Sequence, residues 1–294
     1  MKSFRGTGTA LITPFRKDGS VDEERFVAHV HAQIDGGVEF LVPCGTTGEG
    51  ATLTAEEQRA VIALTVEASE ERVPVMAGAG GNKTEDVVRQ AEGAEDVGAS
   101  AILSVTPYYN RPTPSGLVAH YRAVAGSVGL PVFIYNVPGR TASNVLPDVL
   151  LRIAEIENVK GVKEASGKID QVMTILRQRP DDFLVLSGDD ALTLPYLAIG
   201  ADGVISVVGN QAPDLMSDLV RAGLAGDLRS AREIHYRLLP LMTANFVETN
   251  PIPVKTALEI MGRGPAHFRL PLTPMEEEHR EVLICALKEV GLVT

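Results

Sequence analysis

The residue in this sequence that is best placed to do chemistry is Lys163, in the run Lys-Gly-Val-Lys-Glu-Ala-Ser at 160–166. Apolar residues lead into this run, which predicts a buried strand that ends in a functional loop. Because side chains alternate along a strand, we expect Val159, Gly161 and Lys163 to share one face. If that face lines a barrel, burial lowers the pKa of Lys163 and frees an amine that can attack a carbonyl. The alternative is a surface lysine in a charged loop.

A glycine-rich loop follows the second predicted strand, with the sequence Gly-Thr-Thr-Gly-Glu-Gly at 45–50. Its glycines allow backbone N–H groups to turn toward an anion, and Thr46 and Thr47 add hydroxyl groups. The loop lacks the Gly-Lys-Ser/Thr end of a P-loop, so a carboxylate fits it as well as a phosphate does. A plain tight turn is the alternative.

Tyrosines and an arginine follow two further strands. Tyr108 and Tyr109 come after the fourth strand, where we expect Tyr108 to pack and Tyr109 to point the other way. Tyr135 and Arg140 come after the fifth strand; a phenol can pass protons, and a guanidinium can grip a carboxylate. Singly, such residues are more often structural, but together with a lysine and an anion-type loop at one rim they favour a Schiff-base site.

Four other reactive residues are better explained by structural roles. Asp189 and Asp190 could be metal ligands or a general base, but adjacent acidic residues that open a helix are ordinary caps. Lys255 falls outside the predicted barrel, at the start of a helix. Cys44 is expected to be a small buried packing residue rather than a reactive thiol.

Eight predicted strands, each followed by a helix, would position these groups. The strands are nearly continuous runs of Val, Ile, Leu and Ala, which is typical of parallel strands covered by helices. An open doubly wound sheet usually has a Gly-rich dinucleotide turn after its first strand, and 7–19 contains none. We therefore predict an α/β fold, a (β/α)8 TIM barrel. Its strands are expected at 7–11, 39–43, 74–78, 101–106 and 131–136, then as the strand that ends near Lys163, and then at 183–186 and 203–207.

Strand signals stop after about Gly226, and three helical segments follow, at 227–244, 251–261 and 274–290. We therefore expect a catalytic barrel of residues 1–225 and a C-terminal helical region of residues 226–294.

The net charge of −11 over 294 residues, with no basic patch, argues against nucleic acid and anionic membrane surfaces as partners. No apolar run is long enough to span a membrane. Cys44 and Cys285 are the only cysteines, far apart in a chain without a signal-like start, so we expect a cytoplasmic protein without a disulfide framework. No metal-ligand spacing is present, so a metal is not expected.

Five motifs, in their order and spacing, resemble the dihydrodipicolinate synthase family of pyruvate-dependent Schiff-base aldolases, a superfamily that includes N-acetylneuraminate lyase. The similarity covers essentially the whole chain. The glycine-rich loop and Lys163 indicate only pyruvate chemistry, whereas Arg140 is the feature that separates the synthases from the lyases. The motifs are Gly-Thr-Thr-Gly-Glu at 45–49, Tyr-Tyr-Asn-Arg-Pro at 108–112, Tyr-Asn-Val-Pro-Gly-Arg-Thr at 135–141, Gly-Val-Lys-Glu at 161–164 and Asn-Pro-Ile-Pro-Val-Lys at 250–255.

The resemblance implies that the chain condenses pyruvate with L-aspartate 4-semialdehyde to 4-hydroxy-tetrahydrodipicolinate, in lysine and diaminopimelate biosynthesis. No cofactor is needed, because Lys163 forms a covalent imine with pyruvate. The alternatives are a pyruvate-dependent aldolase acting on a sugar acid, such as an N-acetylneuraminate or 2-keto-3-deoxy sugar acid lyase, and a non-catalytic barrel that binds a carboxylate.

The resemblance also implies roles for individual residues. Tyr135 serves as acid and base, with Thr46 and Tyr109 forming a proton relay. The relay requires a homodimer or homotetramer, because in the family this tyrosine serves the site of a neighbouring subunit. The implied substrate-binding residues are Thr47 for the pyruvate carboxylate, Arg140 for the second substrate, and Gly188 and Ile205 near the lysine.

Overall fold

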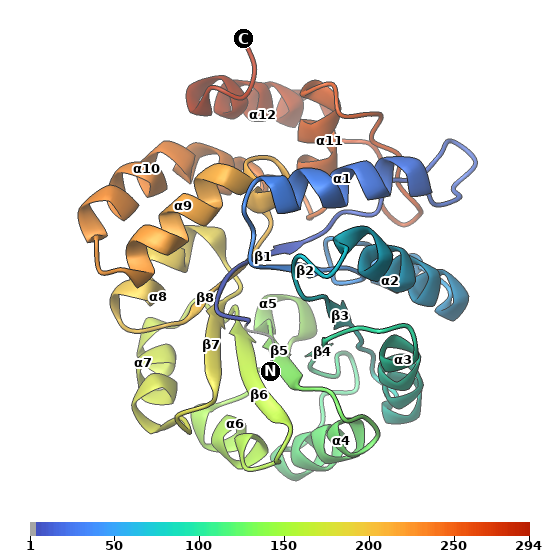
Figure 1. Ribbon diagram of the computed structural model, residues 1–294, viewed down its shortest axis with the longest axis vertical. Helices are drawn as coiled ribbons and strands as arrows, with labels where there is room; N and C mark the ends of the chain where they lie inside the picture. The colour runs from blue at the N-terminus through green and yellow to red at the C-terminus, as the bar shows by residue number, and fades with distance from the viewer. Residues whose placement is uncertain (1–3) are drawn as a thin grey trace.

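Eight parallel strands form the centre of the structure, a computed structural model that describes residues 4–294 (Figure 1). Neighbouring strands pair in the order β2-β1-β8-β7-β6-β5-β4-β3, and a bridge between Leu41 and Val75 brings the two ends together. The predicted barrel is therefore confirmed. Its strands are β1 (Gly6–Ala10), β2 (Phe40–Val42), β3 (Met76–Gly78), β4 (Ala101–Val105), β5 (Val132–Asn136), β6 (Val159–Glu164), β7 (Leu184–Ser187) and β8 (Gly203–Ser206).

Helices surround the strands on the outside (Figure 1). Side-chain caps fix several of their starts: Asp22 caps α1, and Thr54 and Glu57 form a capping box at the start of α2. The helices are α1 (Glu23–Asp35), α2 (Ala55–Ser69), α3 (Thr84–Asp96), α4 (Pro114–Gly126), the single turn α5 (Pro138–Thr141), α6 (Pro147–Ala154), α7 (Ile169–Gln178), α8 (Thr193–Ala198) and α9 (Pro213–Leu224).

Because side chains alternate in direction along each strand, the core is divided into an outer and an inner layer. Ile134, Val162 and Val185 pack outward against the helices, whereas a smaller cluster fills the barrel interior. Among the interior residues, the Phe4 ring contacts the rings of Phe40 and Phe133 edge-on, near the amino ends of their strands. The amino-terminal end of the barrel is thus filled by aromatic side chains, which leaves the carboxyl-terminal end for a site.

The prediction that Val159 shares a face with Lys163 is wrong. Val132 pairs with Val159 but Phe133 pairs with Gly161, so the register shifts and Lys160 has no partner in β5. Such a shift reverses the alternation of the side chains before it. Val159 consequently packs in the outer layer.

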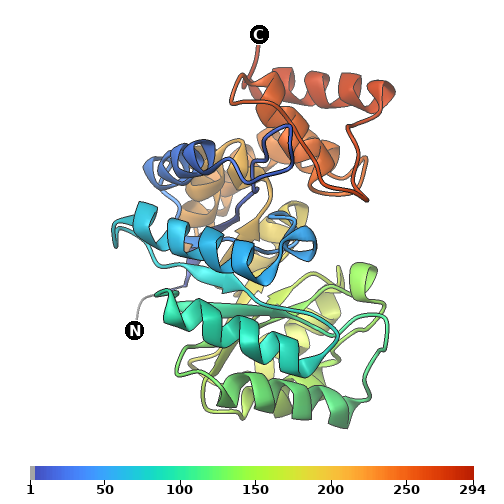
Figure 2. The same ribbon diagram turned by 90° about the vertical axis from the view of Figure 1, so that its right-hand side faces the viewer.

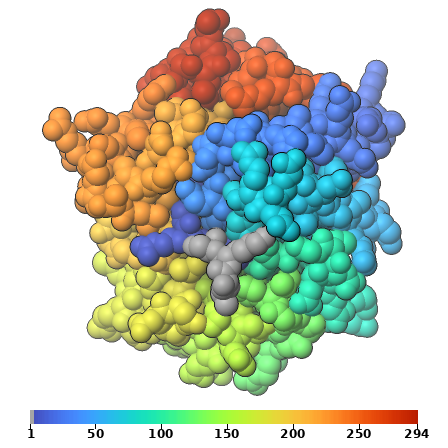
Figure 3. All heavy atoms as spheres, in the orientation of Figure 1, coloured from blue at the N-terminus to red at the C-terminus, as the bar shows by residue number. Residues whose placement is uncertain are grey.

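The C-terminal region extends from one side of the barrel as α10 (Leu228–Ala244), α11 (Ile252–Ile260) and α12 (Glu277–Val290), clearest in side view (Figure 2). In Figure 3 these orange and red helices form one edge of the surface, next to the blue α1. Residues of α10 and α12 share a hydrophobic cluster with α9 of the barrel. The division at residue 225 therefore stays a prediction.

Within residues 4–294, no helix combines the length and the apolar character needed to cross a membrane.

Candidate active site

The loop at 45–50, named here the anion loop, has a backbone shape that its sequence explains. Cys44 before it and Glu49 near its end both have left-handed backbone angles, with φ of 58° and 52°. Gly50 is required because a Cβ there would lie 2.3 Å from the carbonyl oxygen of Cys44. Among residues 4–294, we find no acceptor for the backbone N–H groups of Thr46 and Thr47. Two neighbouring donors are thus available to an anion.

Lys163 lies near the carboxyl-terminal end of β6, with only 5% of its surface exposed. It pairs in register with Tyr135 of β5, and its Nζ lies 4.3 Å from the centre of the Tyr135 ring. Burial lowers the pKa of Lys163 to about 8, although the charge of Asp190 acts in the opposite direction. Within residues 4–294, its Nζ has no hydrogen-bond acceptor. These are the conditions under which a lysine amine becomes a nucleophile.

Tyr135 keeps its proton at neutral pH. Burial raises the pKa of its phenol, while the positive charge of Arg140 and a hydrogen bond with Thr46 oppose the shift. The phenol can therefore donate a proton to a group bound next to Lys163.

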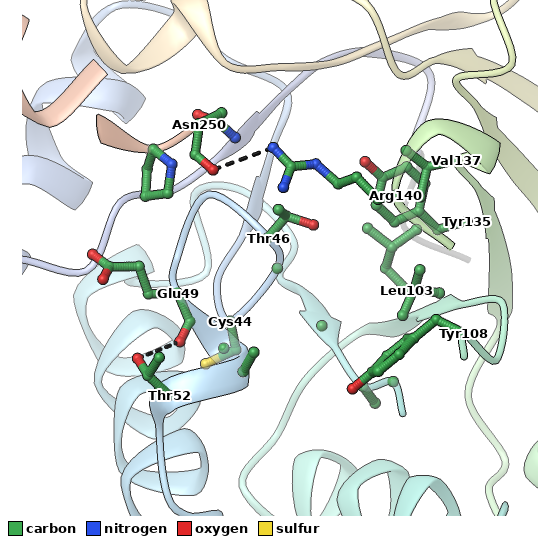
Figure 4. A pocket seen from close by; sticks show the side chains of 18 of the residues that line it. Cys44, Thr46, Glu49, Thr52, Leu103, Tyr108, Tyr135, Val137, Arg140 and Asn250 are labelled. Carbon is green, nitrogen blue, oxygen red and sulfur yellow. Dashed lines mark hydrogen bonds between the residues drawn. The ribbon is translucent and has the colours of Figure 1, made fainter. Parts of the chain in front are cut away.

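Arg140 reaches the same region from α5, the short helix after β5. Its Nη2 donates to the carbonyl oxygen of Asn250 at 3.2 Å, and Figure 4 shows its guanidinium on the side of the pocket that also holds Thr46. The guanidinium's remaining donors can receive a carboxylate.

A cavity of about 400 Å³ lies beside Thr46, Tyr135 and Arg140 (Figure 4). Thr46, Tyr108, Tyr135 and Arg140 line it; Lys163 is not part of the lining, but its Nζ lies over the ring of Tyr135. A cavity of this size with few polar groups suits a small organic ligand.

The C-terminal region supplies one wall of this cavity, which sequence reasoning missed. Asn250 lines the cavity and donates from Nδ2 to the Thr47 hydroxyl at 3.0 Å. The motif at 250–255 was visible in the sequence, but its position against the anion loop depends on a contact across 203 residues. The other wall residues from this region are Thr249, Pro251, Pro271 and Leu272.

Gly188 lies next to Lys163, and Ile205 lies in the barrel interior. A Cβ at Gly188 would lie 2.8 Å from Cβ of Ala165 and 3.1 Å from both Cγ and Cε of Lys163, so a larger residue would crowd the lysine and its neighbour. Ile205 is 1% exposed and belongs to the interior cluster that also contains Tyr135. Both residues therefore contribute to the packing beside the reactive groups.

Tyr109 is not brought together with the other predicted residues. It is 90% exposed and has a left-handed backbone with φ of 68°, at the tip of the loop after β4. Tyr108, which was expected to pack, lines the cavity instead. The structure thus collects Thr46, Tyr135 and Arg140 around Lys163 and leaves Tyr109 pointing outward.

The prediction that Asp189 and Asp190 are helix caps is right for Asp189 and wrong for Asp190. Asp189 caps the 3-10 turn that follows it, by accepting from the backbone of Ala191. Asp190 is not a cap: it is buried, and its Oδ2 accepts from the backbone N–H groups of Val207 and Val208. These long-range partners come from the loop after β8, which the local sequence does not reveal.

The two remaining structural interpretations are confirmed. Cys44 is buried, and burial raises the pKa of its thiol to about 12, so it is not a reactive thiolate. Lys255 lies in the first turn of α11, buried and paired with Glu49.

In the described part of the chain, residues 4–294, no group of three or more His, Cys, Asp or Glu residues could hold a metal ion.

Comparisons with known proteins identify the family of this chain. The model of the dihydrodipicolinate synthetase family matches residues 3–290. The 4-hydroxy-tetrahydrodipicolinate synthase of Maridesulfovibrio salexigens is 50% identical, over 99% of this chain and 100% of that protein.

Solved structures of similar proteins also superimpose on this chain over nearly its whole length. Dihydrodipicolinate synthase from Aquifex aeolicus superimposes with a TM-score of 0.96 at 45% identity, over 98% of this chain and 99% of that one. The chloride-inhibited enzyme from Acinetobacter baumannii, complexed with pyruvate, gives 0.97 at 40% identity, over 99% and 100%. This chain belongs to the dihydrodipicolinate synthetase family.

Proposed function

We propose that this enzyme, a lyase with a class I aldolase mechanism, condenses pyruvate with L-aspartate 4-semialdehyde to give 4-hydroxy-tetrahydrodipicolinate. The observation that carries the proposal is the buried amine of Lys163, whose pKa is lowered to about 8. It lies over the ring of a protonated tyrosine, which is hydrogen-bonded to Thr46 of the anion loop. No cofactor takes part, since the amine itself supplies the covalent chemistry.

In the first step, the Lys163 amine attacks the keto carbon of pyruvate, and loss of water leaves a protonated imine. The pyruvate carboxylate is held by the backbone N–H groups and hydroxyls of Thr46 and Thr47. The positive imine nitrogen then makes a methyl proton acidic, and removal of this proton gives the enamine. Tyr135 supplies and takes up the protons of these steps.

In the second step, the enamine carbon attacks the aldehyde of the second substrate and forms the new carbon–carbon bond. The amino group of that substrate then attacks the imine carbon and displaces the lysine as the ring closes. Lys163 is thereby released as a free amine for the next cycle. Arg140 orients the second substrate by binding its carboxylate.

Tyr109 completes the proton relay from Tyr135 and Thr46 only across a subunit boundary. Its 90% exposure suits a residue that enters a neighbouring site. We therefore include a homodimer or homotetramer in the proposal, together with a cytoplasmic location. Gly188 and Ile205 are assigned to the packing around the bound pyruvate.

An assay with two acceptor aldehydes tests the function. Purified enzyme receives pyruvate with either aspartate semialdehyde or N-acetylmannosamine, and product formation is followed by a coupled reaction. Turnover of aspartate semialdehyde alone is expected. Preference for the sugar would overturn the proposal in favour of a sugar-acid aldolase, and binding of pyruvate without any turnover would indicate a non-catalytic barrel.

The Arg140→Ala variant sharpens this test. It should raise the KM for aspartate semialdehyde by about 100-fold, because a bidentate charged contact is lost, and leave pyruvate binding intact. Arg152→Ala, on the exposed face of α6, is the matched control. Unchanged kinetics in Arg140→Ala would contradict the assigned role.

A further inference from the structure

A second buried lysine contacts the anion loop through Glu49. Lys255 of α11 is 3% exposed. Its Nζ lies 2.6 Å from Glu49 Oε1, 3.0 Å from the Thr13 carbonyl oxygen and 2.5 Å from the His267 carbonyl oxygen. An ammonium group has three protons, and here each has its own acceptor.

The three acceptors around Lys255 match the three protons of an ammonium group. Burial lowers its pKa, but the carboxylate of Glu49 acts against that shift. The Phe15 and Phe268 rings, centred 4.4 Å and 4.9 Å from Nζ, add favourable cation–π contacts. Such a cation with no free proton serves as an anchor rather than a nucleophile.

The anchored partner, Glu49, belongs to the anion loop, and its side chain is buried beside Lys255. In Figure 4 its carboxylate points away from Tyr135 and Arg140. Its backbone N–H donates to the carbonyl oxygen of Thr46 at 3.1 Å. A displacement of the Glu49 backbone would therefore carry Thr46 with it.

Two further hydrogen bonds stabilise the anion loop. The Thr13 hydroxyl donates to the Gly48 carbonyl oxygen at 2.7 Å, and Asn250 donates to the Thr47 hydroxyl at 3.0 Å. Thr13 also accepts from Lys255, so the lysine joins the loops after β1 and β2 to the C-terminal region. Three successive loop residues are thus fixed by their surroundings.

From this geometry we propose that Lys255 is a positioning residue, which acts through Glu49 to hold the anion loop in the shape that binds the pyruvate carboxylate. The inference rests on the proposed function, because it assumes that this loop receives pyruvate. It assigns the C-terminal region a part in binding the first substrate. Preorganised donors lose affinity when their support is removed, even though the donors themselves remain.

Steady-state kinetics of Lys255→Met test the proposal. The variant keeps the length of the side chain and removes its charge, so Glu49 loses its partner. We expect the KM for pyruvate to rise at least about tenfold, while the KM for aspartate semialdehyde changes less than about threefold. Lys288→Met, on the exposed side of α12, is the control and should behave like the unmodified enzyme.

A double variant separates positioning from general stability. If Lys255 acts through Glu49, the pyruvate KM of Glu49→Gln/Lys255→Met should be no higher than that of Lys255→Met alone. A melting temperature that falls while the pyruvate KM of the folded enzyme stays unchanged would overturn the proposal. If Lys255→Met does not fold, Glu49→Gln decides: the proposal requires a raised pyruvate KM, and an unchanged one contradicts it. An unmodified enzyme without synthase activity would instead refute the proposed function.

Discussion

Two buried lysines, one in the barrel and one in the C-terminal region, show how the surroundings determine what an amine does. Lys163 and Lys255 are 5% and 3% exposed. Lys255 has an acceptor for each of its protons, one of them a carboxylate. Within residues 4–294, Lys163 has none, and only the Tyr135 ring lies over its Nζ. Burial alone therefore does not make a nucleophile; burial without hydrogen-bond acceptors does.

The largest effect that this comparison predicts is for Lys163→Arg. A guanidinium keeps the charge but forms no stable imine, so kcat should fall by at least about 1,000-fold. Turnover in a coupled assay measures the change. Lys160→Arg, which can keep its ion pair with Asp182, is the control. A Lys163→Arg enzyme with substantial activity would place the nucleophile elsewhere.

Tyr135→Phe should give the next largest effect. Loss of a general acid and base is expected to lower kcat by about 100-fold, while pyruvate still forms an adduct with Lys163. Tyr196→Phe is the matched control, because Tyr196 is also buried and its hydroxyl has no hydrogen-bond partner in the described residues. Equal losses in the two variants would show that Tyr135 contributes packing only.

Gly188→Ala tests whether packing sets the position of the lysine. The added methyl group would press on Cβ of Ala165 and on Cγ and Cε of Lys163, and overpacking of about 1–3 kcal/mol should slow imine formation by about tenfold or more. Stopped-flow measurement with pyruvate alone isolates this step. Gly126→Ala on α4, where an added Cβ meets nothing within 4 Å, should leave the rate unchanged.

The pH dependence of imine formation should show the smallest of these effects. The reactive form of Lys163 is the free amine, and its pKa of about 8 lies below the ordinary value for lysine. Lowering the pH from 8 to 7 should therefore reduce the rate about fivefold, because the fraction of free amine falls. A rate that keeps rising to pH 10 would mean that burial has not lowered the pKa.

Local sequence patterns were sufficient to predict the barrel and the approximate ends of its strands, because most strands are short runs rich in Val, Ile, Leu or Ala with Gly, Pro or a polar residue close after them. The shift in strand register at Lys160 was not predictable, since it depends on how β6 pairs with β5. Nor were the partners of Asp190 and Asn250, which lie far away in sequence. Side chains whose roles come from distant contacts are those that sequence reasoning misjudges.

Reduction by borohydride in the presence of pyruvate, followed by mass spectrometry of the digested protein, tests the central claim most directly. We predict one stable pyruvate adduct, on Lys163, which forms only when pyruvate is present. The buried Lys255 should stay unmodified in the same sample and serves as an internal control. An adduct on Lys255, or an unmodified Lys163 in active enzyme, would contradict the account.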